Sequence, residues 1–291
     1  MTINTVVFPV AGMGTRFLPA TKVVPKEMLP IVDKPLIQYA VDEAVAAGAN
    51  RLVFVTGRTK NVITDHFDMA YELETELEKR GKHELLKLVE SLLPAGVECL
   101  YVRQRQALGL GHAIACAAPL VHEDSFGIIL PDDLIQNEDD PVMAQLARHH
   151  AASGASVISV EEVEPEKTSA YGVVDVENFE GRSGRLRGIV EKPDPQDAPS
   201  NLAVVGRYIL SSEIFELLNS TAPDHRGEIQ VTDAIAELLK RSPVDAYHFE
   251  GRHYDCGSKL GFLQATVDYG RRHPELAAAF SAWLDQRHEA S

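Results

Sequence analysis

Short runs of apolar, mostly β-branched residues recur along the first half of the chain, with helical patterns between them. These runs predict strands at residues 5–10, 51–56, 97–102, 126–130 and 156–160. Between the first two strands, apolar residues follow helical spacing over 36–45, and Gly48 supplies a stop signal. This alternation predicts an α/β fold with a Rossmann-like, mostly parallel sheet that helices cover on both faces.

The pattern changes after the first 160 residues. From residue 165, short strands punctuated by Gly and Pro predict a second, smaller β region, either continuous with the first sheet or folded over its binding face. Helices are predicted at 211–219, 228–241 and 259–284, and Pro274 should divide the last pattern into two helices. We therefore expect a core at about 1–160, a β region at 161–260 and C-terminal helices at 261–291.

A charged segment at residues 61–93 interrupts the predicted core. Its leucines recur at helical spacing among many charged residues. A solvated helical hairpin is the simplest interpretation, and a contact between subunits is the alternative.

Composition and net charge limit the kinds of molecule that we expect the protein to bind. The 291 residues are 45% hydrophobic, as in an ordinary globular protein. The formal net charge of −15 repels phosphate backbones and anionic lipid, so we expect no nucleic-acid partner. No segment approaches the roughly 18 consecutive apolar residues of a membrane span, and the first residues lack the basic region of a signal peptide. We expect a cytoplasmic protein that makes no membrane contact.

The spacing of cysteine and histidine residues argues against a disulfide framework or a zinc site. Cys99, Cys116 and Cys256 are far apart and form no CxxC pair. The histidines show no HExxH spacing.

A glycine-rich loop follows the first predicted strand. Gly12 and Gly14 stand at the strand's end, where backbone N–H groups can close on phosphate oxygens that a Cβ would obstruct. A GxGxxG fingerprint would need glycine at Phe17, and the GxxxxGK[ST] pattern does not occur. Arg16 and Lys26 lie close behind the loop. Two cations beside a glycine loop, in an otherwise acidic protein, predict a site for a highly charged triphosphate.

Several longer segments along the chain carry motifs in addition to the glycine loop. They are AGMGTRFLPATKVVPKEMLPIVDKPLIQYAVDEAVAAG, RQRQALGLGHAI, ILPDD, AYGVVDV, VEKP, SNLAVVGRYIL, GEIQVTDAI and YDCGSKLGF. In this order they resemble the sugar-1-phosphate nucleotidylyltransferases, and the similarity covers nearly the whole chain. Within that family the chain is most similar to the bacterial uridylyltransferases. The resemblance implies a single nucleotidyltransferase domain in which the first region binds nucleotide and the second binds sugar phosphate.

The implied reaction is transfer of UMP from UTP to glucose 1-phosphate, which gives UDP-glucose and pyrophosphate. A phosphate monoester has a second pKa of about 6, so the sugar phosphate is largely dianionic near neutral pH and needs no general base. Catalysis then consists of aligning two anions that repel each other and neutralising charge at the α-phosphate. Basic residues and Mg²⁺ are the expected agents.

The family's motifs assign roles to individual residues. The implied catalytic residues are Arg16, Lys26, Asp132 and Lys192. The implied nucleotide-binding residues are Ala11, Gly12, Gly14, Thr15, Arg16, Lys26, Glu27, Gln104 and Gly109. Asp132, which follows a predicted strand, and Asp255 are the implied Mg²⁺ ligands, and Asp132 is favoured over Asp133. Cys256 is interpreted as a packing residue, since the reaction requires no nucleophile from the enzyme.

The sugar phosphate is expected to meet residues from the second half of the chain. The implied set is Gly172, Glu191, Lys192, Asn201, Val205 and Gly206. Lys192 would bind the phosphate, and the adjacent Glu191 could accept hydrogen bonds from sugar hydroxyls. Gly172 would allow the hexose to approach the backbone, although a bulge glycine is the alternative interpretation.

Two other functions remain open at the level of sequence. A glucose-1-phosphate thymidylyltransferase would differ by one methyl group on the base, worth only about 1–3 kcal/mol of discrimination. A catalytically inactive nucleotide-binding regulator could dispense with Lys26, Asp132, Asp255 or Lys192, and all four are present. The family also implies a homodimer or homotetramer, with segment 61–93 or the C-terminal helices at the contact.

Overall fold

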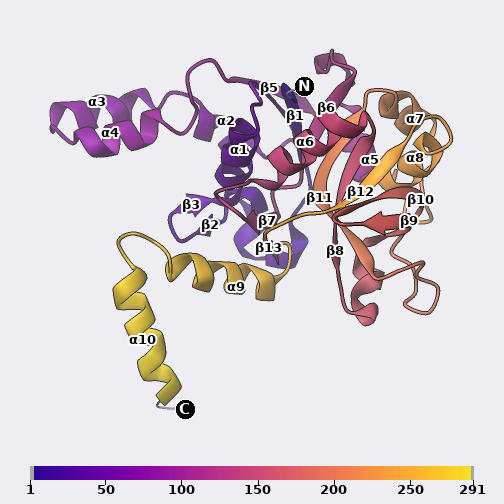
Figure 1. Ribbon diagram of the computed structural model, residues 1–291. Coiled ribbons are helices and arrows are strands. Elements are labelled where there is room, and N and C mark those ends of the chain that lie inside the picture. Colours follow the sequence, from indigo (N-terminus) through magenta and orange to yellow (C-terminus); the bar gives the residue numbers. More distant parts are fainter. Residues whose placement is uncertain (1–2, 290–291) are drawn as a thin grey trace.

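A nine-stranded mixed sheet forms the centre of the computed structural model, which describes residues 3–289 (Figure 1). In spatial order the strands are β5 (Glu98–Arg103), β4 (Arg51–Thr56), β1 (Thr5–Val10), β6 (Ser125–Ile129), β11 (Leu202–Ser211), β8 (Ser156–Glu162), β12 (Val244–His248), β10 (Ser183–Glu191) and β9 (Gly172–Glu180). The first four are parallel to one another, as β8 is to β12, whereas β11 runs antiparallel to both β6 and β8. The predicted mixed, mostly parallel sheet is confirmed.

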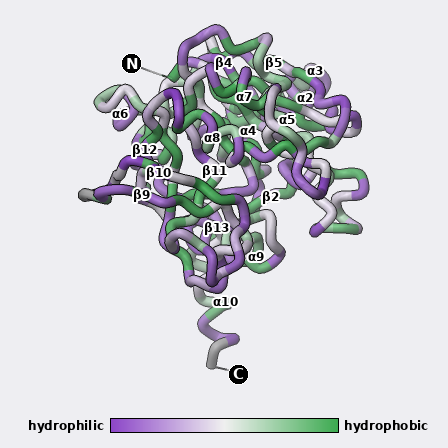
Figure 2. Tube along the Cα trace, turned by 90° about the vertical axis from the view of Figure 1, so that its right-hand side faces the viewer, coloured by the Kyte–Doolittle hydropathy of each residue, from purple (hydrophilic) through white to green (hydrophobic). Residues whose placement is uncertain are grey.

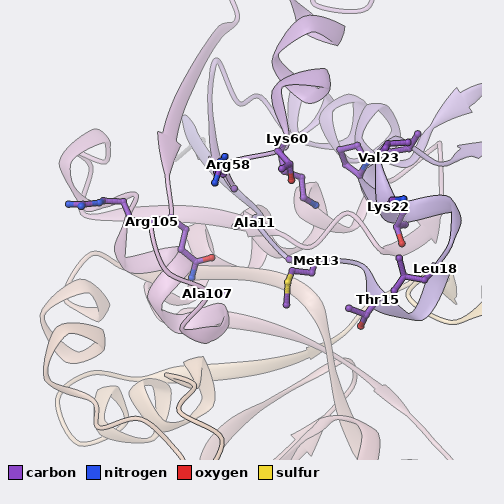
Figure 3. Close-up of a pocket in the computed structure, with 17 residues that line it drawn as sticks. Ala11, Met13, Thr15, Leu18, Lys22, Val23, Arg58, Lys60, Arg105 and Ala107 are labelled. Atoms are coloured by element: carbon purple, nitrogen blue, oxygen red, sulfur yellow. The ribbon is translucent and has the colours of Figure 1, made fainter.

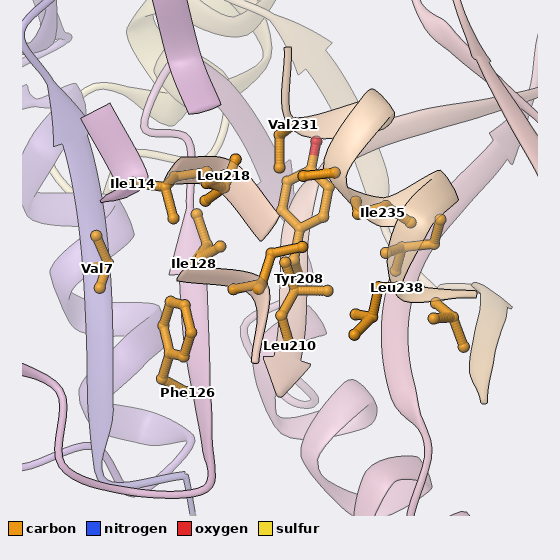
Figure 4. Packing of buried hydrophobic residues seen from close by; sticks show 14 of the residues in the cluster. Val7, Ile114, Phe126, Ile128, Tyr208, Leu210, Leu218, Val231, Ile235 and Leu238 are labelled. Atoms are coloured by element: carbon orange, nitrogen blue, oxygen red, sulfur yellow. The ribbon is translucent and has the colours of Figure 1, made fainter. Parts of the chain in front are cut away.

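Both faces of the sheet are buried, which explains the uninterrupted apolar strands. On β1, Val6 and Phe8 pack in the cluster formed with α1 (Leu36–Ala46) and α6 (Val142–Ser153). Val7 points to the opposite face, where α5 (Gly109–Ala115), α7 (Ile214–Ser220) and α8 (Val231–Leu238) cover a second cluster (Figure 4). Figure 2 shows hydrophobic segments concentrated in these central strands.

The second β region continues the main sheet. β10 pairs with β12 and β9, and β9 also reaches β11 through Ala203 and Val173. A separate ribbon joins β7 (Asp133–Gln136) to β13 (Arg252–Asp255), and β2 (Pro30–Ile31) pairs with β3 (Lys34–Pro35). A small core that includes Tyr254 and the buried Cys256 lies against α9 (Lys259–Gly270).

The charged segment forms three helices, α2 (Asn61–Phe67), α3 (Tyr71–Lys79) and α4 (His83–Glu90). Only α2 buries side chains, and α3 and α4 form the predicted hairpin, which projects from the body (Figure 1). The last predicted helical pattern divides around Pro274 into α9 and α10 (Ala277–Glu289), as expected. Among residues 3–289, no helix has both the length and the apolar character that crossing a membrane requires.

A buried ion pair connects the sheet to α1. The guanidinium of Arg207, on β11, donates from Nε and Nη2 to the two carboxylate oxygens of Glu43 at 2.9 and 2.8 Å. Its Nη1 also donates to the Leu130 carbonyl oxygen at 3.2 Å. Arg207 is 1% exposed, so this pair lies in the interior.

We expect Arg207→Leu to lower the free energy of unfolding by roughly 3–5 kcal/mol, because it leaves the Glu43 carboxylate buried without its partner. Urea denaturation measures this loss. Arg241→Leu is the matched control, since it breaks an exposed pair with Glu216, and it should cost less than about 1 kcal/mol. Equal losses in the two variants would contradict the expectation.

Candidate active site

The glycine loop after β1 folds back on the segment that carries Lys26. Gly14 has a φ of 66°, in the left-handed region that favours glycine. A Cβ at this position would lie 3.2 Å from the Lys26 Cβ. The Thr21 hydroxyl donates to the Gly14 carbonyl at 2.7 Å, which holds the loop closed. The left-handed turn at Gly14 therefore brings the glycine loop and Lys26 together.

A cavity of about 460 Å³ lies over this loop, at the carboxyl ends of the parallel strands β1, β4 and β5 (Figure 3). Its lining includes the predicted Ala11, Gly12, Thr15 and Gln104, together with Met13, Lys22, Arg58, Lys60 and Arg105. Sequence reasoning missed the last five, of which four are cationic. Arg58 and Lys60 come soon after the predicted strand 51–56. Ligand sites in such folds lie at the carboxyl ends of the strands, so this position could have identified the two residues. A cationic cavity at this edge suits a phosphorylated ligand.

Gln104 is held in place from α5. Its amide Nε2 donates to the Gly109 carbonyl at 3.0 Å and lies 3.0 Å from His112 Nδ1. Gly109 has a φ of 90°, and a Cβ there would lie 2.9 Å from the Glu228 Cβ. Gly109 therefore supports Gln104 and packs against residue 228, instead of lining the cavity.

Four of the predicted residues converge at one point. Lys26 Nζ lies 2.5 Å from Asp132 Oδ2, and Arg16 Nη1 donates to the Gly257 carbonyl at 3.3 Å. A Cβ on Gly257 would lie 2.9 Å from Asp255 Oδ1, 3.1 Å from Asp132 Oδ2 and 3.3 Å from Arg16 Nη1. Arg16 and the two carboxylates, from three distant parts of the chain, therefore surround Gly257, and Lys26 joins them through Asp132.

The electrostatics of this cluster suit a bound cation. Burial raises the pKa of Asp255, and the nearby negative charges of Asp133 and Asp132 raise it further. Burial alone would lower the pKa of Lys26, but the carboxylates of Asp132 and Glu27 outweigh it, so the pKa lies above its usual value. Among residues 3–289, no group of three His, Cys, Asp or Glu side chains could hold a metal alone. Phosphate oxygens of a ligand would complete the shell of a Mg²⁺ ion there.

Asp133 is turned toward protein partners. Its Oδ2 accepts from the Gly206 N–H at 3.0 Å, and its Oδ1 lies 3.1 Å from His253 Nε2. Burial opposes ionisation, but His253 and Arg207 outweigh it and lower the pKa of Asp133. Likewise, burial disfavours the charged imidazole, but Asp133 and Glu161 raise the pKa of His253 to about 10. This arrangement agrees with the preference for Asp132 as the ligand.

A second cavity, of about 290 Å³, lies on the other side of the glycine loop. Its predicted lining residues are Arg16, Asp132, Gly172, Glu191, Lys192, Gly206 and Asp255. Tyr171, Tyr208, Glu228, Gln230 and Thr232 also line it and were missed. These five residues lie in the segments AYGVVDV, GRYIL and GEIQVTDAI, so their positions in those segments could have identified them as site residues. Thr15 lines the first cavity and Arg16 the second, so the loop separates two adjoining sites.

Lys192 reaches the second cavity from a strained backbone. Its φ is 45°, and its N–H donates to the Tyr171 carbonyl at 3.0 Å. Its Nζ lies 2.5 Å from Glu191 Oε1, while Glu191 Oε2 accepts from the Thr232 hydroxyl at 3.2 Å. A Cβ on Gly172 would lie 3.0 Å from Thr232 Cγ2. The cavity therefore presents an ammonium and a carboxylate, and Gly172 packs closely against Thr232 beside them.

Six predicted residues line neither cavity: Gly14, Lys26, Glu27, Gly109, Asn201 and Val205. Glu27 is 1% exposed, and its carboxylate accepts from Lys60 Nζ at 2.6 Å; burial raises the pKa of Glu27 and lowers that of Lys60. Val205 points into the core because it alternates with Val204 and Gly206, which face the cavity. Asn201 is exposed outside the second cavity, and its carbonyl accepts from the Val163 N–H.

Comparison with known proteins agrees with this geometry. The nucleotidyl transferase family model matches residues 7–272. A UTP–glucose-1-phosphate uridylyltransferase from Escherichia coli is 49% identical, over 98% of this chain and 96% of its own. A UTP-bound UGPase from Acinetobacter baumannii is 44% identical, with a TM-score of 0.91 over 97% of this chain and 98% of its own. A UDP-glucose pyrophosphorylase complexed with UDP-glucose is 45% identical, with a TM-score of 0.86 over 93% of this chain and 100% of its own. The chain therefore belongs to the nucleotidyl transferase family.

Proposed function

We propose that the protein transfers UMP from UTP to glucose 1-phosphate and forms UDP-glucose and pyrophosphate. The observation that carries this proposal is that Arg16 and Asp132 line the second cavity directly after the glycine loop of the first, with Lys26 Nζ 2.5 Å from the Asp132 carboxylate. The similar structures support it, since one is described as UTP-bound and another as complexed with UDP-glucose. These molecules are a substrate and a product of the proposed reaction.

The two cavities divide the substrates between them. UTP would occupy the cavity over the glycine loop, where backbone N–H groups and the cations Lys22 and Arg58 face its phosphates. Glucose 1-phosphate would occupy the second cavity, with Lys192 at its phosphate and Glu191 at its hydroxyls. Arg16, which lines the second cavity beside the loop, would then stand between the two reacting phosphates.

The chemistry follows from this placement. An oxygen of the sugar phosphate forms a bond to the α-phosphorus of UTP while the bond to the pyrophosphate oxygen breaks. The Lys26 ammonium would stabilise the charge that develops on the leaving pyrophosphate. Arg16 would reduce the repulsion between the two anions and align them.

The residues present fit a divalent cation, because the carboxylate oxygens of Asp132 and Asp255 converge around Gly257. We propose that these two aspartates hold Mg²⁺ together with phosphate oxygens of UTP. When bound, the ion neutralises negative charge on those phosphate oxygens. Lys26 adds a second positive charge beside Asp132 and competes with the ion for the Asp132 carboxylate.

Pyrophosphate release tests the reaction. We would incubate the purified protein with Mg²⁺ and glucose 1-phosphate, compare UTP with dTTP at equal concentration, and use EDTA as the blank. We expect release that is selective for UTP. Faster release from dTTP would instead support a thymidylyltransferase, and UTP binding without turnover would support a nucleotide-binding regulator.

We further propose that the protein forms a homodimer or homotetramer. The projecting helices expose large apolar side chains, including Leu73 on α3, Leu85 and Leu88 on α4, and Trp283 on α10. Such side chains are typical of contacts between subunits. Light scattering at micromolar concentration measures the mass, and a monomeric mass would contradict this proposal.

A further inference from the structure

A hydrogen-bonded bridge of three side chains lies behind the cluster around Gly257. His253 on β13 lies between two carboxylates, with Nε2 3.1 Å from Asp133 Oδ1 and Nδ1 2.5 Å from Glu161 Oε1. The His253 side chain is only 5% exposed. An imidazole ring presents its two nitrogen atoms in different directions, so it can connect two carboxylates that do not touch each other.

The bridge starts from the ribbon that carries Asp255 and that begins directly after Asp132. Asp133 on β7 pairs in register with Asp255 on β13, and the Cys256 N–H donates to the Asp132 carbonyl at 2.8 Å. The ribbon consists of only these two strands and is not part of the nine-stranded sheet. A two-stranded ribbon is marginally stable by itself, so its position depends on contacts with the rest of the protein.

The bridge connects this ribbon to the main sheet at two points. Glu161 stands near the carboxyl end of β8, and Asp133 Oδ2 accepts from the Gly206 N–H on β11. Asp133 lines the second substrate cavity, whereas Glu161 and His253 line neither of the two substrate cavities. The proposed reaction gives them no direct contact with UTP or glucose 1-phosphate.

We propose that Asp133, His253 and Glu161 are positioning residues that fix the separation of the Asp132 and Asp255 carboxylates and so determine the affinity for the divalent cation. The inference rests on the proposed function for the identity of the bound ion and of the nucleotide. Its physical basis is that groups which orient metal ligands contribute to metal affinity, often by ten- to a hundredfold.

The test replaces His253 with Phe, which keeps an aromatic ring and removes both hydrogen bonds. Mn²⁺ serves as the probe, and its dissociation constant is measured by electron paramagnetic resonance with and without UTP. We expect His253→Phe to raise the Mn²⁺ dissociation constant by about tenfold or more and to lower kcat by a similar factor. The dissociation constant for UTP in EDTA should change less than about twofold.

His149→Phe is the matched control. His149 on α6 lies 2.9 Å from the Asp245 carboxylate, and its side chain is 20% exposed. Asp245 stands at the start of β12, whereas Glu161 stands near the end of the parallel strand β8. Removing this pair should lower the thermal stability but leave the Mn²⁺ dissociation constant and kcat unchanged.

Further variants separate positioning from a purely structural role. His253→Arg restores a cation that can donate to two carboxylates, and it should recover Mn²⁺ affinity to within about threefold of the natural protein. If His253→Phe does not fold, Glu161→Ala replaces it, because the Glu161 side chain is 26% exposed and its loss leaves the buried pair intact. An unchanged Mn²⁺ dissociation constant in folded His253→Phe or Glu161→Ala would overturn the proposal.

The Mn²⁺ titration also separates this proposal from the proposed function. A protein that makes no UDP-glucose but loses Mn²⁺ affinity on His253→Phe would support the bridge and contradict the reaction. A protein that makes UDP-glucose but keeps its Mn²⁺ affinity on His253→Phe would support the reaction and contradict the bridge. If the natural protein has no Mn²⁺ site that depends on Asp132, the positioning role is overturned as well.

Discussion

Asp132→Asn is expected to lower kcat for UDP-glucose formation by at least about a thousandfold, while the affinity for UTP in EDTA stays the same or increases. The substitution removes a carboxylate charge from the proposed metal site, and metal ions supply several kcal/mol of charge stabilisation in such reactions. It also releases Lys26, whose Nζ lies 2.5 Å from the carboxylate, to face the triphosphate.

Steady-state kinetics across a Mg²⁺ titration measure the first effect, and calorimetric titration of UTP in EDTA measures the second. Asp285→Asn is the control, because Asp285 is exposed on α10 and should leave both quantities unchanged. A folded Asp132→Asn protein that keeps Mg²⁺-dependent turnover would refute the assignment of Asp132.

Lys26→Met is expected to lower kcat by roughly a hundred- to a thousandfold, the range observed when one preorganised donor to a transition state is removed. Asp132→Asn should weaken the binding of Mg²⁺, whereas Lys26→Met should not weaken it. Without the ammonium, the Asp132 carboxylate has no ion-pair partner at 2.5 Å, so the Mg²⁺ concentration for half-maximal rate should stay the same or fall.

The same Mg²⁺ titration tests this prediction at saturating UTP and glucose 1-phosphate. Lys240→Met serves as the control, because the Lys240 side chain is 68% exposed and forms an exposed ion pair with Glu237 on α8. A higher Mg²⁺ requirement in Lys26→Met would show that Lys26 supports metal binding and would contradict the proposed competition for Asp132.

The fold was predictable where local pattern and burial agree. The parallel strands β1 and β4 are buried on both faces, so their apolar runs are continuous. The helical hairpin was predictable from leucines among charges, and the division near Pro274 from the rigid ring of proline. The ribbon of β7 and β13 was not predictable, because its four-residue strands are 115 residues apart and too short for a periodic signal.

The sequence could predict which residues belong to the candidate site, but it could not predict which of their side chains contact one another. Arg16, Lys26, Asp132 and Asp255 stand in motifs, and the structure brings all four together. Glu27 follows Lys26 directly, yet its carboxylate is buried against Lys60. No short-range pattern distinguishes the residue that faces the site from its neighbour that faces the interior, because both lie in one short 3₁₀ helix, Lys26–Met28.

The sequence by itself determined the class of the protein: an acidic α/β chain with a glycine loop, two cations behind it and aspartates after apolar strands. Those features depend on local backbone geometry and on charge, which neighbouring residues specify. Only the tertiary structure decided that Asp133 faces His253, which in turn meets Glu161, while Asp132 faces Lys26. Asp132 lies in the turn just before β7 and Asp133 begins that strand, and the partner that each one meets, Lys26 or His253, is more than a hundred positions away in the sequence.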